Sequence, residues 1–178
     1  MALLKNYYKK IIKYDLINKF TYKQLKEIPK LKKVNLNFGC NNFDCKSLAS
    51  TMLAFELITN KQGKLTNLRQ PNLLLKIKKG APVGCSLTLY KTDAYNFCFK
   101  LINEIFPNLK EFKGFVTNKK QKTTTFSFTI KELITFNELE THFYLFSNLP
   151  KLNITMLTDT QTQAELLYLL KSLKIPLN

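Results

Sequence analysis

The chain has 178 residues, 45% of them hydrophobic, and a formal charge of +16. This length and apolar content predict one globular domain with a real core. No apolar run approaches the roughly 20 residues that span a membrane, and the N-terminus shows neither a secretory signal nor an Arg-rich import presequence. A charge of this size favours a polyanionic partner such as nucleic acid; a lysine-rich surface that only aids solubility is the alternative.

The positive charge is unevenly placed along the chain. Residues 1–131 hold 25 Lys and Arg against 7 Asp and Glu, whereas residues 132–178 hold 3 against 5. The first three quarters of the chain therefore carry the positive field. Arg69 is the only arginine, Lys, Asn, Ile and Phe are abundant, and Gly is scarce. This composition is what AT-rich coding favours, and it indicates an organellar or endosymbiont genome.

The first predicted elements are a helix and a strand. Apolar residues at helical spacing over residues 1–20 predict an amphipathic helix with a basic outer side. It could lie on a membrane surface, but a helix that packs on a core and turns its wet side to phosphate is favoured. Residues 30–39 then alternate with period two, which places Lys33, Asn35 and Asn37 on one face of a strand. Amide side chains suit RNA; a solvent-facing polar side is the alternative.

A strand, a long basic loop and a return strand are predicted over residues 64–90. They follow a helix that Asp44 caps and that runs to about Thr59. The loop, residues 68–80, carries Arg69 and three lysines suited to phosphate. Its three leucines, Leu73, Leu74 and Leu75, would be costly if exposed, which indicates a covering partner; a hairpin folded back on its own core is the alternative. The return strand alternates and sets Ser86 and Thr88 on one face.

The last third of the chain adds two helices and two strands. Thr92 or Asp93 is expected to cap a helix that Pro107 ends. A basic loop at residues 110–122, a strand at 123–130 and a loop or short helix at 133–144 follow. Residues 152–158 form the last strand, and a Thr160-x-x-Gln163 capping box opens the last helix. The chain is thus predicted to be a single α+β domain, residues 1–178. Its sheet is mainly antiparallel, with helices on one face, the other face open for RNA and the basic loop between two central strands.

The sequence holds no catalytic or metal-binding constellation. It lacks a P-loop, a dinucleotide fingerprint and a zinc-protease motif. Cys85 with His142 would need a third, orienting group to act as nucleophile and base. The cysteines, Cys40, Cys45, Cys85 and Cys98, lack paired zinc-ribbon spacing, so buried free thiols in a reducing compartment are expected. We therefore expect no enzyme, metal or cofactor. An RNA-processing enzyme, or an RNA-binding assembly factor or chaperone outside the mature ribosome, stays as the alternative.

Several segments resemble one family in the same order along the chain. KIKKGAPVGCSLTL is the most specific, and LKNYYKKIIKYDLINKFTYKQLKEIPKLKKVNLNFG, FPNLKEFKGF and LNITMLTDTQTQAELLYLLKSLKIPL flank it. They are similar to motifs of the large-subunit ribosomal protein five family, which binds 5S rRNA in the central protuberance. The chain departs from the family pattern at Asn60-Lys61, where relatives have Gly-Gln, and at NKKQKTTTFSFTI, which replaces a Gly/Arg-rich loop and strand.

The resemblance implies a structural role in translation and a set of contacts. By motif position, Asn37, Thr66 and Thr88 would face 5S rRNA; Lys33, Asn35 and Ser86 are expected on the same strand faces. The tRNA-side loop would comprise Arg69, Asn72, Leu73, Leu74, Leu75, Lys76, Lys78 and Lys79 and approach P-site tRNA. The implied partners also include large-subunit rRNA, neighbouring central-protuberance proteins and a small-subunit head protein at an intersubunit bridge, but no membrane. The expected location is the mitochondrial matrix, in the mitochondrial ribosome, with a plastid or the bacterial cytoplasm as alternatives.

Overall fold

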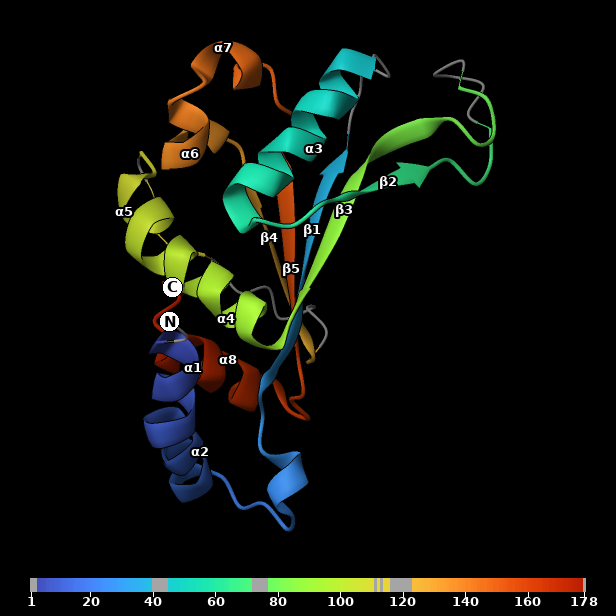
Figure 1. Cartoon of the computed structure of the whole chain (residues 1–178). Helices are drawn as coiled ribbons and strands as arrows, with labels where there is room; N and C mark the ends of the chain where they lie inside the picture. Colours follow the sequence, from blue (N-terminus) through green and yellow to red (C-terminus); the bar gives the residue numbers. More distant parts are fainter. Residues whose placement is uncertain are drawn as a thin grey trace. The chain divides into compact units, whose positions relative to one another are not determined.

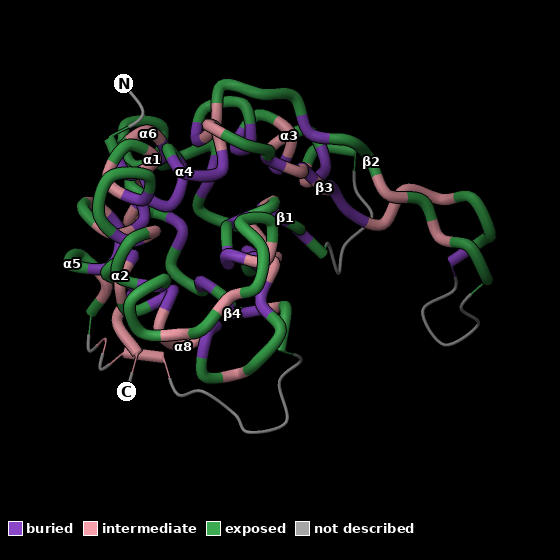
Figure 2. The backbone as a smooth tube through the Cα atoms, turned by 90° about the horizontal axis from the view of Figure 1, so that it is seen from below, coloured by how far each residue is buried: buried purple, intermediate pink, exposed green. Residues whose placement is uncertain are grey.

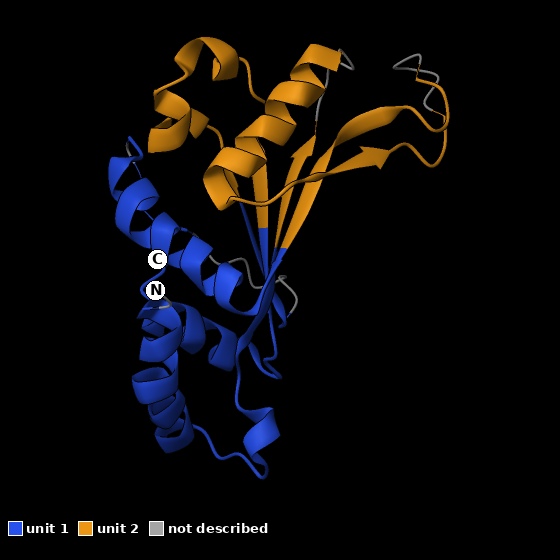
Figure 3. Ribbon diagram, in the orientation of Figure 1, with its two compact units in different colours: residues 1–34, 89–128, 155–178 blue, residues 35–88, 129–154 orange. Residues whose placement is uncertain are grey.

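The computed structural model describes residues 3–39, 45–71, 77–110, 112, 114–115 and 123–177. The chain divides into two compact units (Figure 3). Unit 1 comprises residues 1–34, 89–128 and 155–178, and unit 2 comprises residues 35–88 and 129–154. Four of the strands begin in one unit and end in the other, so each unit contains part of the same sheet.

The sheet is five-stranded and antiparallel, in the order β2-β3-β1-β5-β4 (Figure 1). Its strands are β1 (Leu31–Gly39), β2 (Lys64–Asn67), β3 (Pro82–Tyr90), β4 (Thr125–Ile130) and β5 (Leu152–Thr158). The predicted α+β class and antiparallel sheet are confirmed. One detail differs: the basic loop joins an edge strand, β2, to β3, not two central strands. A four-residue, mostly exposed strand is typical of a sheet edge, where a short strand limits pairing with other chains.

Unit 2 packs one long helix on its part of the sheet. Helix α3 (Cys45–Thr59) lies along β1 and β3 in Figure 1. The ring of Phe55 lies 4.6 Å from that of Phe38 in β1, centroid to centroid. The Thr51 hydroxyl lies 3.1 Å from the Cys85 sulfur in β3. The apolar side chains of this part of the sheet are therefore buried against α3.

Short helices follow β4 in unit 2. They are η4 (Leu133–Thr135), α6 (Asn137–Glu140) and α7 (Phe143–Phe146). The predicted loop or short helix at residues 133–144 is thus confirmed. Helix α3 lies against both α6 and α7. Leu139 and Phe146 are buried, but the other three side chains of α7, Phe143 to Leu145, are exposed.

Unit 1 begins with one continuous helical run. It consists of α1 (Leu3–Tyr7), the π-helix η1 (Tyr8–Ile12) and α2 (Lys13–Lys19), so the predicted N-terminal helix is confirmed. Its buried side chains, Leu4, Tyr8, Ile12 and Leu16, recur at every fourth residue. Positions four apart drift around an α-helix of 3.6 residues per turn. The wider π-turn corrects the drift and keeps all four against the core.

A second helical run in unit 1 packs against the first. Helices α4 (Lys91–Lys100), η3 (Leu101–Ile105) and α5 (Phe106–Asn108) follow β3, and α1 lies against α4. The expected cap at Thr92 or Asp93 is wrong, because the helix already begins at Lys91 and has no side-chain cap. The Thr92 hydroxyl instead accepts a hydrogen bond from Lys5 Nζ, 2.8 Å away. Pro107 lies inside α5 and not beyond the helix.

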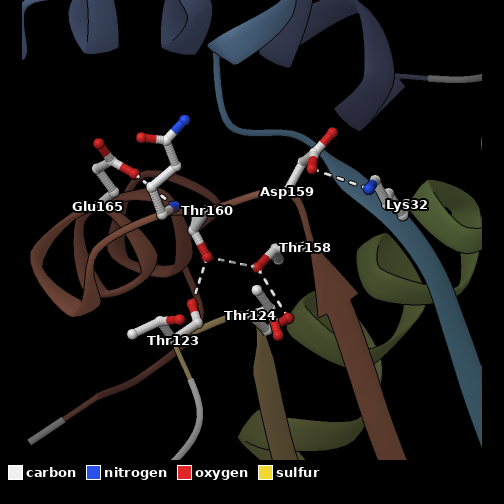
Figure 4. A network of polar contacts seen from close by, with 8 residues as sticks. Lys32, Thr123, Thr124, Thr158, Asp159, Thr160 and Glu165 are labelled. Atoms are coloured by element: carbon white, nitrogen blue, oxygen red, sulfur yellow. Dashed lines mark hydrogen bonds and ion pairs between the residues drawn. The ribbon is translucent and has the colours of Figure 1, made fainter.

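The last helix of unit 1 is opened by a different capping pair from the predicted one. Helix α8 (Gln163–Ser172) has Thr162 as its N-cap, paired with Glu165 in a capping box. Thr160 is used elsewhere: its hydroxyl donates to the Thr123 carbonyl and lies 3.0 Å from the Thr158 hydroxyl (Figure 4). This network joins the end of β5 to the residues before β4. It therefore anchors the C-terminal end of the basic segment 110–122. A short 3-10 helix, η2 (Leu25–Glu27), precedes β1.

Candidate RNA-binding face

Strand β1 separates an apolar face from a polar one. Val34, Leu36 and Phe38 are buried, and Phe38 contacts α3. The alternate residues in unit 2, Asn35 and Asn37, are half-buried and exposed respectively. Because successive side chains of a strand point to opposite faces, both amides lie on the face opposite α3. The predicted orientation of this strand is confirmed.

Strands β2 and β3 extend the same polar face. Cys85 contacts Thr51 of α3, so its neighbours Ser86 and Thr88 point to the opposite side. In the β2–β3 register Lys64 pairs with Ser86 and Thr66 pairs with Gly84. Directly opposed residues of an antiparallel pair share a face. Lys64 and Thr66 therefore lie on the face that carries Ser86 and Thr88.

Five of the six predicted 5S rRNA residues thus lie on one face of the sheet in unit 2; we call it the polar face. They are Asn35, Asn37, Thr66, Ser86 and Thr88. The sixth, Lys33, belongs to unit 1 and is half-buried. Sequence analysis missed Lys64, which is exposed. The period-two pattern that selected Thr66 also includes Lys64, two residues earlier, so the signal was present.

Hydrogen bonding divides the polar side chains of unit 2 into two groups. Thr129 of β4 donates to Asn153 of β5 over 2.8 Å, so these two side chains satisfy each other. In contrast, Asn35 Oδ1 is enclosed and has no hydrogen-bond partner among the described residues. An enclosed carbonyl oxygen without a donor is costly. The strands β1 to β3 therefore offer unused hydrogen-bonding capacity to a ligand.

A glycine lets two strands of this face approach closely. A Cβ atom built on Gly84 of β3 would lie 2.2 Å from the Phe38 carbonyl oxygen and 3.3 Å from the Thr66 hydroxyl. Only a residue without a side chain fits between these atoms. Gly84 thus permits the spacing that brings Thr66, Ser86 and Asn37 onto one continuous surface.

The basic loop begins as an extension of the β2–β3 pair. Leu68 N donates to the Ala81 carbonyl and Gly80 N donates to the Leu68 carbonyl, both over 2.9 Å. Gly80 has a φ of 86°, which this turn requires and glycine adopts readily. Figure 2 shows this arm of unit 2 as mostly exposed and half-buried chain. Arg69, Lys78 and Lys79 are exposed on it. The predicted contacts Asn72, Leu73, Leu74, Leu75 and Lys76 lie outside the described residues.

The thiols do not form a catalytic or metal site. Burial raises the pKa of Cys85, although its hydrogen bond with Thr51 acts in the opposite direction. Burial raises the pKa of Cys98 to about 12. Both stay protonated at neutral pH and are poor nucleophiles. The expectation of buried thiols is confirmed for these two but is wrong for Cys45, which is exposed; Cys40 lies outside the described residues. No group of His, Cys, Asp and Glu within the described ranges could hold a metal ion.

Two further properties bear on the kind of partner. In the part of the chain that the structure describes, no helix has the length and apolar character to cross a bilayer. The acidic residues gather in one place: residues 129–154 hold Glu132, Glu138 and Glu140 against Lys131 and Lys151. That segment differs from the rest of a chain whose net charge is +16. A polyanion is therefore expected to avoid it.

The chain is similar to ribosomal proteins over its full length. Residues 82–177 match the model of the C-terminus of the ribosomal uL5 family. The large ribosomal subunit protein uL5m of Reclinomonas americana is 34% identical over 180 residues, which cover 100% of this chain and 99% of that protein. The uL5 protein of Nitrosomonas europaea is 32% identical, with 99% and 98% covered. That of Malacoplasma penetrans is 30% identical, with 98% and 94% covered.

Proposed function

The chain belongs to the uL5 family of large-subunit ribosomal proteins, and we propose that its polar face binds 5S rRNA. This is a family of structural ribosomal proteins, so the chain is not an enzyme and its general role is in translation. Large-subunit rRNA is the polyanion that its charge of +16 suits. The proposal concerns which RNA is bound and by which surface.

The observation that carries the proposal is the unused hydrogen-bonding capacity of the polar face. Asn35 Oδ1 lacks a donor among the described residues, and Asn37 is exposed beside it on β1. Thr66, Ser86 and Thr88 add hydroxyl groups, which can donate to or accept from ribose and phosphate oxygens. The face also carries a cation, Lys64, for phosphate. Amides, hydroxyls and a lysine together suit an RNA surface better than an apolar protein surface.

The arm beyond β2 and β3 is proposed to contact P-site tRNA. Arg69, Lys78 and Lys79 are exposed on an arm that extends from the rest of unit 2 (Figure 1). An arginine can hold a phosphate with two hydrogen bonds, and lysines act as point charges. The predicted leucines of the loop would be covered in the assembled particle. The family resemblance supports tRNA as the target of the arm.

Protein partners are proposed at the acidic segment of unit 2. Residues 129–154 carry a net negative charge, and α7 exposes Phe143, Tyr144 and Leu145. Exposed aromatic and aliphatic side chains beside carboxylates suit a basic protein and not RNA. We assign this segment to the small-subunit head protein at the intersubunit bridge. Neighbouring central-protuberance proteins would complete the surroundings of the chain.

The mitochondrial matrix is the proposed compartment. One relative that matches the whole chain is named uL5m, the mitochondrial form, while similar bacterial proteins are named uL5. The composition adds independent support, because abundant Lys, Asn, Ile and Phe with one arginine reflect AT-rich coding. Detection of the chain in purified mitochondrial ribosomes would test this location; detection only in plastid or cytosolic ribosomes would contradict it.

The 5S rRNA proposal is tested by removing two side chains of the polar face. In the double variant Asn37→Ala, Thr88→Ala, two hydrogen bonds to RNA are lost, each of about 1 kcal/mol. We expect the affinity for 5S rRNA in a filter-binding assay to fall roughly 30-fold. The matched control is Ser50→Ala, Thr141→Ala, which removes exposed side-chain groups of unit 2 away from the polar face, where each hydroxyl bonds only its own helix. Equal affinity of the two double variants would refute the proposal.

A further inference from the structure

The N-terminal helical run has a second apolar surface that no described part of the chain covers. Its core side is formed by Leu4, Tyr8, Ile12 and Leu16, which are all buried. On the other side Leu3 is 56%, Ile11 46%, Tyr14 61% and Ile17 40% exposed. We call these four residues the outer apolar patch. A single exposed apolar residue needs no explanation, but four along one helical run indicate an interaction site.

The charges around the outer apolar patch are positive. Lys9 and Lys10 are exposed and form no ion pair within the described part of the chain. The exposed acidic residue of this run is Asp15. By contrast, Lys5 donates to Thr92 and Lys19 lies 4.1 Å from the centroid of the Tyr168 ring. The lysines next to the patch are thus available to a partner, whereas those at its margins already have one.

We infer that the outer apolar patch docks an amphipathic helix with acidic flanks from a neighbouring protein. The patch spans a continuous helical run from Leu3 to Lys19, about 25 Å at roughly 1.5 Å per residue. A partner helix of similar length could place its apolar stripe on the patch. Its Asp or Glu residues would then meet Lys9 and Lys10. This goes beyond the proposed function, which places no partner on unit 1.

The chemistry of the patch favours a protein helix over RNA. Leucine and isoleucine side chains offer no hydrogen bond to phosphate or ribose, and RNA would leave them partly exposed. RNA-binding surfaces instead expose aromatic rings for stacking or polar groups for hydrogen bonds. Tyr14 alone could serve in that way. An anionic membrane surface would also attract lysine and apolar groups, so it is included as an outcome of the test.

The test uses the full chain and synthetic helical peptides of 18 residues. One peptide carries Leu and Ile along one face with Glu on both flanks, and a second is a scrambled form of the same composition. We expect the chain to bind the amphipathic peptide in fluorescence anisotropy about tenfold more tightly than the scrambled one. The double variant Ile11→Ser, Tyr14→Ser should abolish this preference, because two apolar anchors are lost. Its net charge is unchanged, so attraction by charge alone is held constant.

Matched controls separate this docking from the other candidates. The double variant Phe143→Ser, Tyr144→Ser removes exposed aromatic side chains of α7 and should retain the tenfold preference. Equal binding of both peptides, no binding of either, or an Ile11, Tyr14 variant that binds like the native chain would overturn the inference. Duplex RNA and vesicles of three parts phosphatidylcholine to one part phosphatidylglycerol form two further arms. A loss of affinity for either on the Ile11, Tyr14 change, without peptide preference in the native chain, would also overturn it.

Discussion

At the scale of single residues, the polar face depends on groups that do not stand out in the sequence. Asn35 and Asn37 are ordinary strand residues until the burial of Phe38 against α3 fixes which way they point. Gly84 has no side chain of its own but decides how closely β3 approaches the Phe38 carbonyl. The function of this face is therefore set by residues that bind nothing as well as by those that are proposed to bind RNA.

The contrast between two glycines gives a prediction at this scale. Gly84→Ala would place a Cβ atom 2.2 Å from a backbone oxygen, which cannot move without disturbing the pairing of β1 and β3. We expect a loss of about 1–3 kcal/mol in the free energy of unfolding, measured by urea denaturation. Gly39→Ala is the control, because no described heavy atom lies within 4 Å of its added Cβ. Equal midpoints for the two variants would show that β3 and β1 are not this close.

At the scale of elements, the π-turns and the arm follow from different causes. The helical runs of unit 1 contain a π-turn where buried residues recur at every fourth position, so packing overrides regular helix geometry. The arm extends from an edge strand, where few neighbours restrain it. The arm carries cations that its own unit does not use. An element with little intramolecular purpose and several free charges is expected to act between molecules.

The arm makes a prediction about the salt dependence of tRNA binding. Replacing Lys76, Lys78 and Lys79 by Ala removes up to three phosphate contacts and the counterions that they release. The slope of log K against log salt should become shallower by about 2. The control variant replaces Lys46, Lys131 and Lys151, which are exposed in unit 2 but not on the arm. If both triple variants change the slope equally, the arm has no special place at phosphate.

At the scale of the whole molecule, local patterns in the sequence predicted most of the fold. Period-two alternation located β1, β4 and β5, and helical spacing located α3 and the N-terminal run. What failed depends on contacts distant in sequence. The edge position of β2 depends on strand order, and the capping box moved to Thr162 because Thr160 bonds Thr123 and Thr158. The polar face followed from alternation, but the unpaired oxygen of Asn35 required the packed structure.

The final prediction concerns the assembled particle. A protein held by charge alone loses roughly 10³–10⁵ in affinity between 50 and 200 mM salt, whereas hydrogen bonds of the polar face and docked side chains are much less sensitive to salt. We therefore expect the chain to cosediment with large subunits in equimolar amount at 200 mM salt. Subunits depleted of 5S rRNA are the control and should retain less of it. Recovery of the chain only as free protein would exclude a stable place in the particle and favour an RNA chaperone that acts outside the ribosome. Equal retention with and without 5S rRNA would instead leave the protein in the subunit but remove 5S rRNA as its anchor.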